Sequence, residues 1–163
     1  MSTPAVSPSG FSLSPPTPEE RKALEAELSP AEADVLLHHG TEAPFCGGLL
    51  DQKDDGVYCC RLCALPLFRH KTKFESGTGW PSFWAPFDEA HVQGVRDTSY
   101  GMVRIETLCA RCGSHQGHVF PDGPPPTRLR YCINSVCLEF VPDGGALRDP
   151  LSRGDDAALR SMA

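Results

Sequence analysis

Two pairs of cysteines have a spacing that suits metal binding. Cys60 and Cys63 form one C-x-x-C pair, and Cys109 and Cys112 form a second pair after 45 intervening residues. Two residues between the cysteines allow a tight turn to direct both sulfurs at one ion, and two such turns complete a tetrahedron around Zn²⁺. Four thiolates leave no open position, which predicts a structural zinc site. Fe²⁺ at the same ligands and four unrelated buried or redox cysteines are the alternatives.

The other cysteines, of eight in the chain, remain for other chemistry: Cys46, Cys59, Cys132 and Cys137. The chain begins with neither the basic segment nor the apolar segment that directs export, so we expect a cytoplasmic protein whose thiols are reduced. A disulfide framework is the alternative explanation, and it is typical of short secreted chains.

Cys132 has the neighbours that a reactive thiol needs. In a strand, Arg130, Cys132 and Asn134 would point to one face, so that a guanidinium and an amide flank the sulfur. A nearby cation lowers the pKa of a thiol, and the thiolate is the nucleophilic form. A buried strand cysteine between surface residues is the alternative.

Two other segments carry side chains that could act with a thiolate. The segment 113–123 contains His115, His118 and Asp122, which could supply a proton donor and an orienting partner. The segment 76–84 is a glycine-rich loop that contains both tryptophans of the chain. Its rings could form a wall for a small apolar group, or they could belong to the core.

The N-terminal region predicts two short helices. Thr17 begins a capping box with Glu20, so we expect a helix that runs to about Leu28. A second capping box begins at Ser29, and Gly40 offers a left-handed residue that could end the second helix.

After Gly40, short apolar runs alternate with Gly, Pro, Asp and Ser, which indicates strands. The predicted strands are Val57–Cys59, Val92–Arg96, Met102–Leu108, His118–Phe120, Leu129–Ile133 and Val136–Val141. They favour a mainly β fold of antiparallel sheets around a packed core.

Composition divides the 163 residues into one domain and two tails. Residues 1–18 hold five prolines, five serines and no charged side chain, which predicts a disordered tail. We expect the ordered domain over residues 19–141 and a loose polar tail over residues 142–163. The net charge of −6 disfavours nucleic-acid binding, and no run of about 20 apolar residues predicts a membrane span. Nothing in the sequence indicates more than a monomer.

Four segments together resemble the signature blocks of one enzyme family. They are Ser76–Phe83, Cys109–Cys112, Gly117–Pro124 and Arg130–Ser135, in the family's order. In these blocks the chain is similar to the peptide-methionine (R)-S-oxide reductases, the B-type methionine sulfoxide reductases, over about residues 19–141. The resemblance implies two packed antiparallel sheets behind N-terminal helices.

The resemblance also implies roles for individual residues. Cys132 would attack the sulfoxide sulfur, and Trp80 and Phe120 would contact the substrate. The polar active-site set would be His115, His118, Asp122, Arg130 and Asn134, with His118 as the expected acid, and the structural zinc ligands would be Cys60, Cys63, Cys109 and Cys112. Reduction of methionine (R)-sulfoxide in oxidised proteins would convert Cys132 to a sulfenic acid. A second thiol would then form a disulfide that thioredoxin reduces.

One position departs from a common pattern of that family. Thr78 stands where many members have the resolving cysteine. Cys46 is the expected substitute, because some members resolve from the loop in which it lies. Cys137 is five residues along the same predicted strand from Cys132 and would point to the opposite face, and Cys59 has no comparable argument.

Two other functions remain open from the residues alone. A zinc-stapled β domain could bind a partner through the tryptophan loop without catalysis. Zinc-dependent hydrolysis is a weaker alternative, because His115 and His118 lack a third ligand and a four-thiolate site has no open position. An ordinary pKa at Cys132, without sulfenic acid after exposure to a methyl sulfoxide, would favour the binding module.

Overall fold

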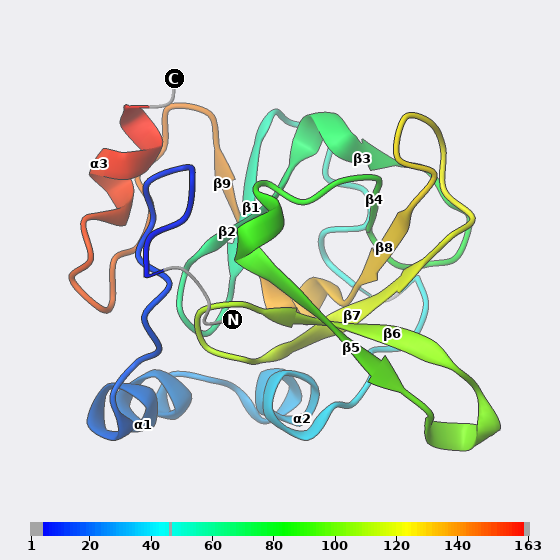
Figure 1. Ribbon diagram of the computed structural model, residues 1–163, viewed down its shortest axis with the longest axis horizontal. Coiled ribbons are helices and arrows are strands. Elements are labelled where there is room, and N and C mark those ends of the chain that lie inside the picture. The colour runs from blue at the N-terminus through cyan, green and yellow to red at the C-terminus, as the bar shows by residue number, and fades with distance from the viewer. Residues whose placement is uncertain (1–4, 46, 162–163) are drawn as a thin grey trace.

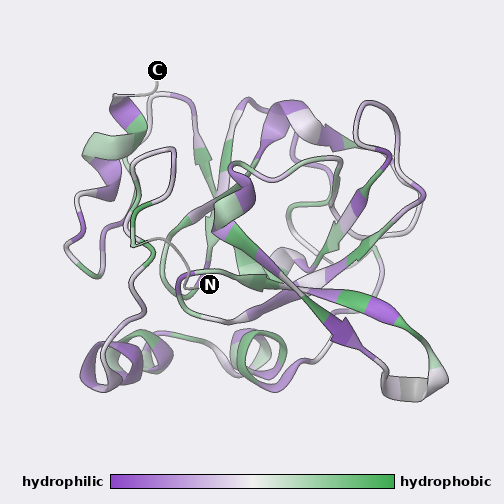
Figure 2. Cartoon of the chain, in the orientation of Figure 1, coloured by the Kyte–Doolittle hydropathy of each residue, from purple (hydrophilic) through white to green (hydrophobic). Residues whose placement is uncertain are grey.

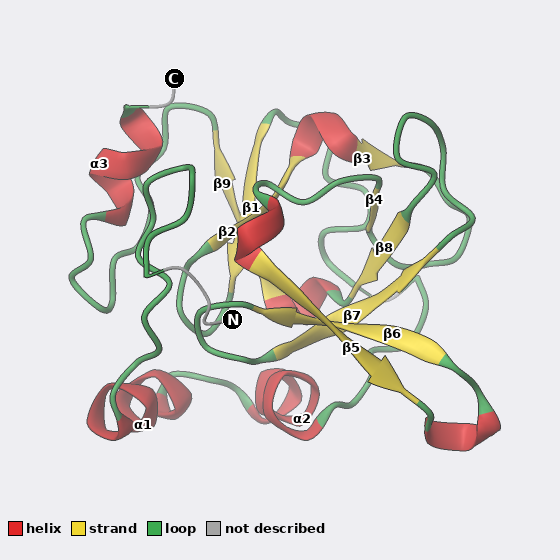
Figure 3. Cartoon of the chain, in the orientation of Figure 1, coloured by secondary structure: helices red, strands yellow, loops and turns green. Residues whose placement is uncertain are grey.

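The computed structural model describes residues 5–45 and 47–161, and it contains two antiparallel sheets (Figures 1 and 3). The strands are β1 (Gly56–Cys60), β2 (Pro66–Arg69), β3 (Lys73–Phe74), β4 (Ser82–Phe83), β5 (Val92–Asp97), β6 (Arg104–Cys109), β7 (His115–Phe120), β8 (Arg130–Ile133) and β9 (Leu138–Pro142). One sheet has the order β2-β1-β9 and the other has the order β3-β4-β8-β7-β6-β5. The predicted mainly β fold with two sheets is confirmed.

Over the described residues, three α-helices accompany the sheets: α1 (Pro18–Ala26), α2 (Pro30–His38) and α3 (Asp155–Arg160). The capping boxes predicted at Thr17 and Ser29 are both present. The end of α2 differs from the prediction, because His39 rather than Gly40 adopts the left-handed conformation, with φ 58°. Within the described ranges, we find no helix with the length and apolar character that a membrane span requires.

Most predicted strands are present, and the short ones were missed. The segment predicted as one strand over residues 136–141 is divided, because Ser135–Cys137 forms a 3₁₀ turn before β9 begins at Leu138. The prediction missed β2, β3 and β4. Two of these have only two residues each, too few for a period to show, and β2 begins with a proline.

The core lies between the two sheets. Phe68 of β2 and Phe83 of β4 are fully buried, and their rings stack with centroids 4.5 Å apart. Tyr58 of β1 meets Phe83 edge to face at 5.0 Å. Each contact joins one sheet to the other, so burial of these rings stabilises the packing of both sheets together. Helices α1 and α2 each carry both hydrophobic and hydrophilic residues (Figure 2), and they bury Leu24, Val35 and Leu36.

Residues 5–18 pack against the domain and do not form the disordered tail that composition predicted. Phe11 and Leu13 are 1% and 3% exposed and belong to the main core, and Ser7 Oγ lies 2.8 Å from Nε2 of buried His91. Two large apolar side chains are enough to anchor a proline-rich segment when a preformed surface receives them, which composition alone does not show.

The described part of the C-terminal segment, residues 142–161, also packs against the domain, in contrast to the loose tail that was expected. Leu147 and Leu151 are buried, and Asp155 at the start of α3 forms a buried ion pair of 2.8 Å with Arg111. Arg153 donates to Ser12 Oγ at 2.9 Å, so the two end segments lie against each other (Figure 1).

Candidate active site and metal centre

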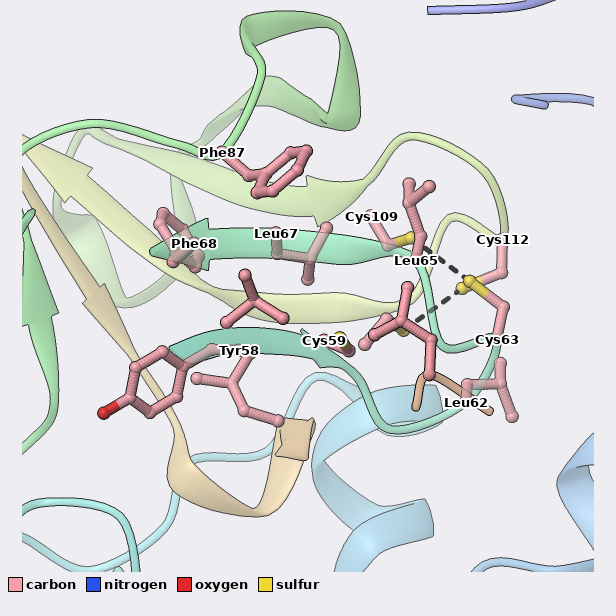
Figure 4. Close-up of a cluster of buried hydrophobic side chains, with 14 of the residues drawn as sticks. Tyr58, Cys59, Leu62, Cys63, Leu65, Leu67, Phe68, Phe87, Cys109 and Cys112 are labelled. Carbon is pink, nitrogen blue, oxygen red and sulfur yellow. Dashed lines mark hydrogen bonds between the residues drawn. The ribbon is translucent and has the colours of Figure 1, made fainter. Parts of the chain in front are cut away.

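The four cysteines of the two C-x-x-C pairs form one buried cluster. One sulfur from each lies within 4.8 Å of the other three. The Sγ atoms of Cys60 and Cys112 are 3.7 Å apart, and those of Cys63 and Cys109 are 3.6 Å apart. A tetrahedron with bonds of about 2.3 Å has edges of about 3.8 Å, so the sulfurs fit a single tetrahedral ion. Figure 4 shows Cys63, Cys109 and Cys112 gathered beside the buried leucines.

The two cysteine turns share one backbone design. Ala64 N donates to Cys60 O at 2.8 Å, and Gly113 N donates to Cys109 O at 2.8 Å. The residue after each pair, Ala64 or Gly113, is left-handed. Because one turn follows β1 and the other joins β6 to β7, the cluster links the two sheets.

Two arginines bind backbone carbonyls of the cysteine turns. Arg111 donates to Cys63 O at 2.6 Å, and Arg21 donates to Cys112 O at 2.6 Å. Guanidinium groups satisfy carbonyls that the tight turns leave without strand partners, which fixes the turns in place.

Cys132 lies within β8 between two neighbouring strands. Its direct partner in β7 is His118, and its partner in β4 is Ser82. Directly paired residues of antiparallel strands point to the same face with Cβ atoms about 4.5–5.5 Å apart. The structure therefore brings the predicted nucleophile and the predicted acid together.

A small cleft of about 100 Å³ opens over this pair. Its lining residues are Thr41, Trp80, Arg104, Gly117, His118, Phe120, Cys132 and Asn134. Cys132 is half-buried, in contrast to the buried cysteines of the cluster. The prediction missed Thr41 and Arg104. Arg104 could have been found from the sequence, because its side chain is charged within a strand that has many apolar residues. No feature of the sequence marked Thr41 as a site residue.

The prediction of a lowered pKa at Cys132 is wrong for the free site. Burial raises the pKa of the Cys132 thiol, and the Thr78 hydroxyl and the charge of Arg130 lower it only in part. Thr78 Oγ1 lies 3.9 Å from the sulfur. The guanidinium of Arg130 is also shared, because it makes two hydrogen bonds of 2.9 and 3.0 Å to Asp122.

Arg130, paired with Asp122, packs on Phe120, which is one of the residues that line the cleft. The guanidinium carbon of Arg130 lies 4.3 Å from the centroid of the Phe120 ring, its cross-strand partner. The hydrogen bonds from Arg130 lower the pKa of Asp122, which stays ionised and exposed. Arg130, oriented by Asp122, therefore holds the Phe120 ring in place.

Each histidine of the predicted polar set has its own carboxylate. His118 Nε2 lies 2.8 Å from Asp97 Oδ2, and His115 Nδ1 lies 2.6 Å from Glu106 Oε2. His115 is 2% exposed, and burial lowers its pKa, so its ring is neutral at pH 7. It lies behind His118, with ring centroids 5.6 Å apart, and does not line the cleft.

Asn134 and Trp80 are held by one residue that sequence reasoning missed. Glu42 N donates to Asn134 Oδ1 at 3.0 Å, and Trp80 Nε1 donates to Glu42 O at 3.0 Å. Asn134 also donates to Gln116 O at 3.0 Å, which fixes the orientation of its amide. The sequence pattern could not identify Glu42 as a site residue, because it lies in a loop and holds Asn134 and Trp80 through its backbone.

Of the remaining cysteines, two are buried and one lies outside the described residues. Cys59 and Cys137 are 1% and 0% exposed, and burial raises the pKa of both thiols. Cys46, the expected resolving cysteine, lies outside the described residues. Its neighbour Phe45 donates from its backbone N to Gly79 O at 2.7 Å, directly beside Trp80.

Comparisons with known proteins agree on one family. The SelR domain model matches residues 28–142. A peptide methionine sulfoxide reductase MsrB of Caulobacter vibrioides is 75% identical over 150 residues, which cover 92% of this chain and 94% of that protein. The MsrB proteins of Xylella fastidiosa and Pseudomonas entomophila are 58% and 56% identical and cover 93% and 77% of this chain, and 97% and 94% of their own. The chain therefore belongs to the peptide methionine sulfoxide reductase MsrB family of SelR-domain enzymes.

Proposed function

We propose that this chain reduces methionine (R)-sulfoxide in oxidised proteins to methionine, with Cys132 as the nucleophile. The observation that carries the proposal is the direct pairing of Cys132 with His118 under a cleft lined by Trp80 and Phe120. The relatives are named for peptide methionine sulfoxide reduction. The preference for the R isomer rests on the family resemblance.

The small cleft accounts for the choice of substrate group. Its volume of about 100 Å³ suits the methyl and sulfinyl end of a side chain rather than a larger ligand. Trp80 and Phe120 offer apolar surface to the methyl group, and His118 and Asn134 offer polar atoms to the oxygen. The backbone of an oxidised protein would stay outside the cleft.

The chemical step converts a thiol and a sulfoxide into a sulfenic acid and a thioether. The Cys132 sulfur attacks the electrophilic sulfoxide sulfur, and the oxygen is transferred to Cys132 as methionine leaves. Because the pKa of Cys132 is raised in the free site, its proton must be removed as the substrate binds. His118, oriented by Asp97, is the group that moves a proton between the thiol and the oxygen.

A second thiol then condenses with the sulfenic acid to form a disulfide and release water. Cys46 is the proposed partner, because the thiols of Cys59 and Cys137 are buried and have raised pKa values. Reduced thioredoxin would regenerate both thiols by exchange and leave with the disulfide.

We also propose that the four-cysteine cluster binds a structural Zn²⁺. The donor set of four soft thiolates and the sulfur distances of 3.6 and 3.7 Å fit this ion. With four protein ligands, the bound ion would contribute stability and no catalytic position. Elemental analysis of the purified protein distinguishes zinc from iron.

Turnover coupled to thioredoxin on separated R and S sulfoxides tests the function. We expect turnover of a peptide methionine (R)-sulfoxide and none of the S isomer, and we expect Cys132→Ser to remove it. A Cys46→Ser variant should keep the first reduction and lose thioredoxin-dependent turnover. Full turnover by Cys132→Ser would contradict the proposal, and a disulfide from Cys132 to Cys59 or Cys137 would contradict the role of Cys46.

A further inference from the structure

A second group of potential metal ligands lies beside the active site. One atom each from His39, Glu106 and His115 lies within 4.8 Å of the other two. Both imidazoles direct Nδ1 at the same oxygen, Oε2 of Glu106, and the two ring centroids are 5.2 Å apart. The proposed reduction does not use His39.

The backbone brings these three residues together from three elements. His39 is the left-handed residue that ends α2, and Glu106 lies in β6. The register between β6 and β7 shifts between Thr107 and Leu108, so that Leu108 pairs with His115 instead of with Gln116. Without that extra residue, His115 would point to the face opposite Glu106, because side chains alternate along a strand.

The group has two mostly buried ligands and one side chain that is accessible to solvent. The side chains of His115 and Glu106 are 2% and 12% exposed, whereas that of His39 is 58% exposed. An ion could therefore enter from the side of His39 and meet two partly desolvated ligands. Two imidazoles and one carboxylate suit the divalent ions Co²⁺, Ni²⁺ and Zn²⁺, and three protein ligands leave positions for water.

We propose that His39, Glu106 and His115 bind a first-row divalent metal ion, separate from the four-cysteine cluster. The ion takes the place of the protons that link the two imidazoles to Glu106. It also fixes His115, which packs against His118 with ring centroids 5.6 Å apart. A consequence that rests on the proposed function is that the bound ion slows reductase turnover.

Co²⁺ binding to the full chain, with zinc already in the four-cysteine cluster, tests the site without any turnover. We expect one additional equivalent of Co²⁺, with visible absorption that lacks the intense charge-transfer bands of thiolate ligands. His39→Asn should weaken this binding by on the order of 100-fold, as loss of a ligand does. Asparagine tolerates the left-handed conformation of residue 39, so this variant is expected to fold.

The neighbouring His38 supplies a matched control, because it is exposed and lies outside the group. His38→Asn should bind Co²⁺ like the unaltered chain. Thiolate bands from the additional ion, no additional equivalent, or equal binding by His39→Asn would overturn the proposal. In the turnover assay, Co²⁺ should slow the unaltered chain and His38→Asn more than His39→Asn, and equal slowing would overturn the proposed consequence.

Discussion

The four-cysteine cluster and the Cys132 cleft place the same side chain in two different surroundings. The cluster sulfurs are buried at the ends of strands and in tight turns, whereas Cys132 is half-buried within β8. Arg111 and Arg21 bind the backbone of the cluster turns. At the cleft, Arg130 is turned toward Asp122, and Thr78 Oγ1 lies 3.9 Å from the sulfur.

This difference fits the separate roles that we propose for the two kinds of sulfur. The cluster brings the turn after β1 to the turn between β6 and β7, so its sulfurs link the two sheets. At the cleft, strand pairing fixes the backbone of Cys132, and its sulfur is the nucleophile of the proposed reaction. The comparison predicts that one region governs stability and that the other governs turnover.

Replacement of a single cysteine by serine should give the largest effects on stability and on turnover, and the clearest contrast between the two regions. With the proposed zinc bound, Cys109→Ser would remove one ligand of a metal that contributes to folding, so we expect the free energy of unfolding to fall by about 5 kcal/mol or more. Cys132→Ser should change it by less than about 1 kcal/mol and lower turnover by at least about 1,000-fold. Urea unfolding and the coupled turnover assay measure the two quantities.

Chelation provides a check on the same contrast that needs no variant. Removal of the metal should lower the thermal midpoint of the unaltered chain strongly. The same loss of stability in Cys132→Ser before chelation would contradict the separation of the two regions.

The buried ion pair near the cluster should give the next largest effect. Asp155→Ala leaves Arg111 buried without its carboxylate, which is expected to cost about 3–5 kcal/mol in the free energy of unfolding. Arg160→Ala breaks the exposed pair with Asp156 in the same helix and should cost less than about 1 kcal/mol. Equal, small losses in urea unfolding would show that the C-terminal segment does not stabilise the domain.

A change at His118 should act on turnover alone. His118→Gln removes the group that faces Cys132 across the strand pair, so turnover should fall by about 100- to 10,000-fold. The exposed His38 offers the control His38→Gln, which should leave turnover unchanged. A fall of similar size in both variants, or a loss of stability in His118→Gln, would remove the catalytic assignment.

Loss of one hydroxyl should give the smallest effect. The Thr78 hydroxyl lowers the pKa of Cys132 and so opposes the effect of burial. Thr78→Val should therefore raise this pKa and move the midpoint for alkylation of Cys132 to higher pH, by less than about one pH unit. Peptide mapping after alkylation measures the midpoint, and Thr78→Ser should keep it. A shift to lower pH would contradict the role of the hydroxyl.

Local signals predicted much of the fold and part of the site. The repeated C-x-x-C spacing identified all four cysteines of the cluster, and the capping boxes located both N-terminal helices. Strand alternation predicted that Arg130 and Cys132 share a face, which agrees with their pairing to Phe120 and His118.

Properties that depend on contacts distant in sequence were not predictable. The raised pKa of Cys132 comes from burial by other elements, which the charge of Arg130 does not overcome. Glu42 supports Trp80 and Asn134 from a loop, and the irregular register near Thr107 decides where His115 points. The end segments looked disordered by composition, but a few apolar side chains fit a surface that the rest of the chain forms.

The most direct test of the account is a single turnover without reductant. Cys46→Ser, mixed with one equivalent of a peptide methionine (R)-sulfoxide, should yield one methionine per chain. A sulfenic acid should be trapped by a selective reagent at Cys132 and located by mass spectrometry. Methionine formation without modification of Cys132, or a trapped sulfenic acid at any other cysteine, would contradict Cys132 as the reacting sulfur.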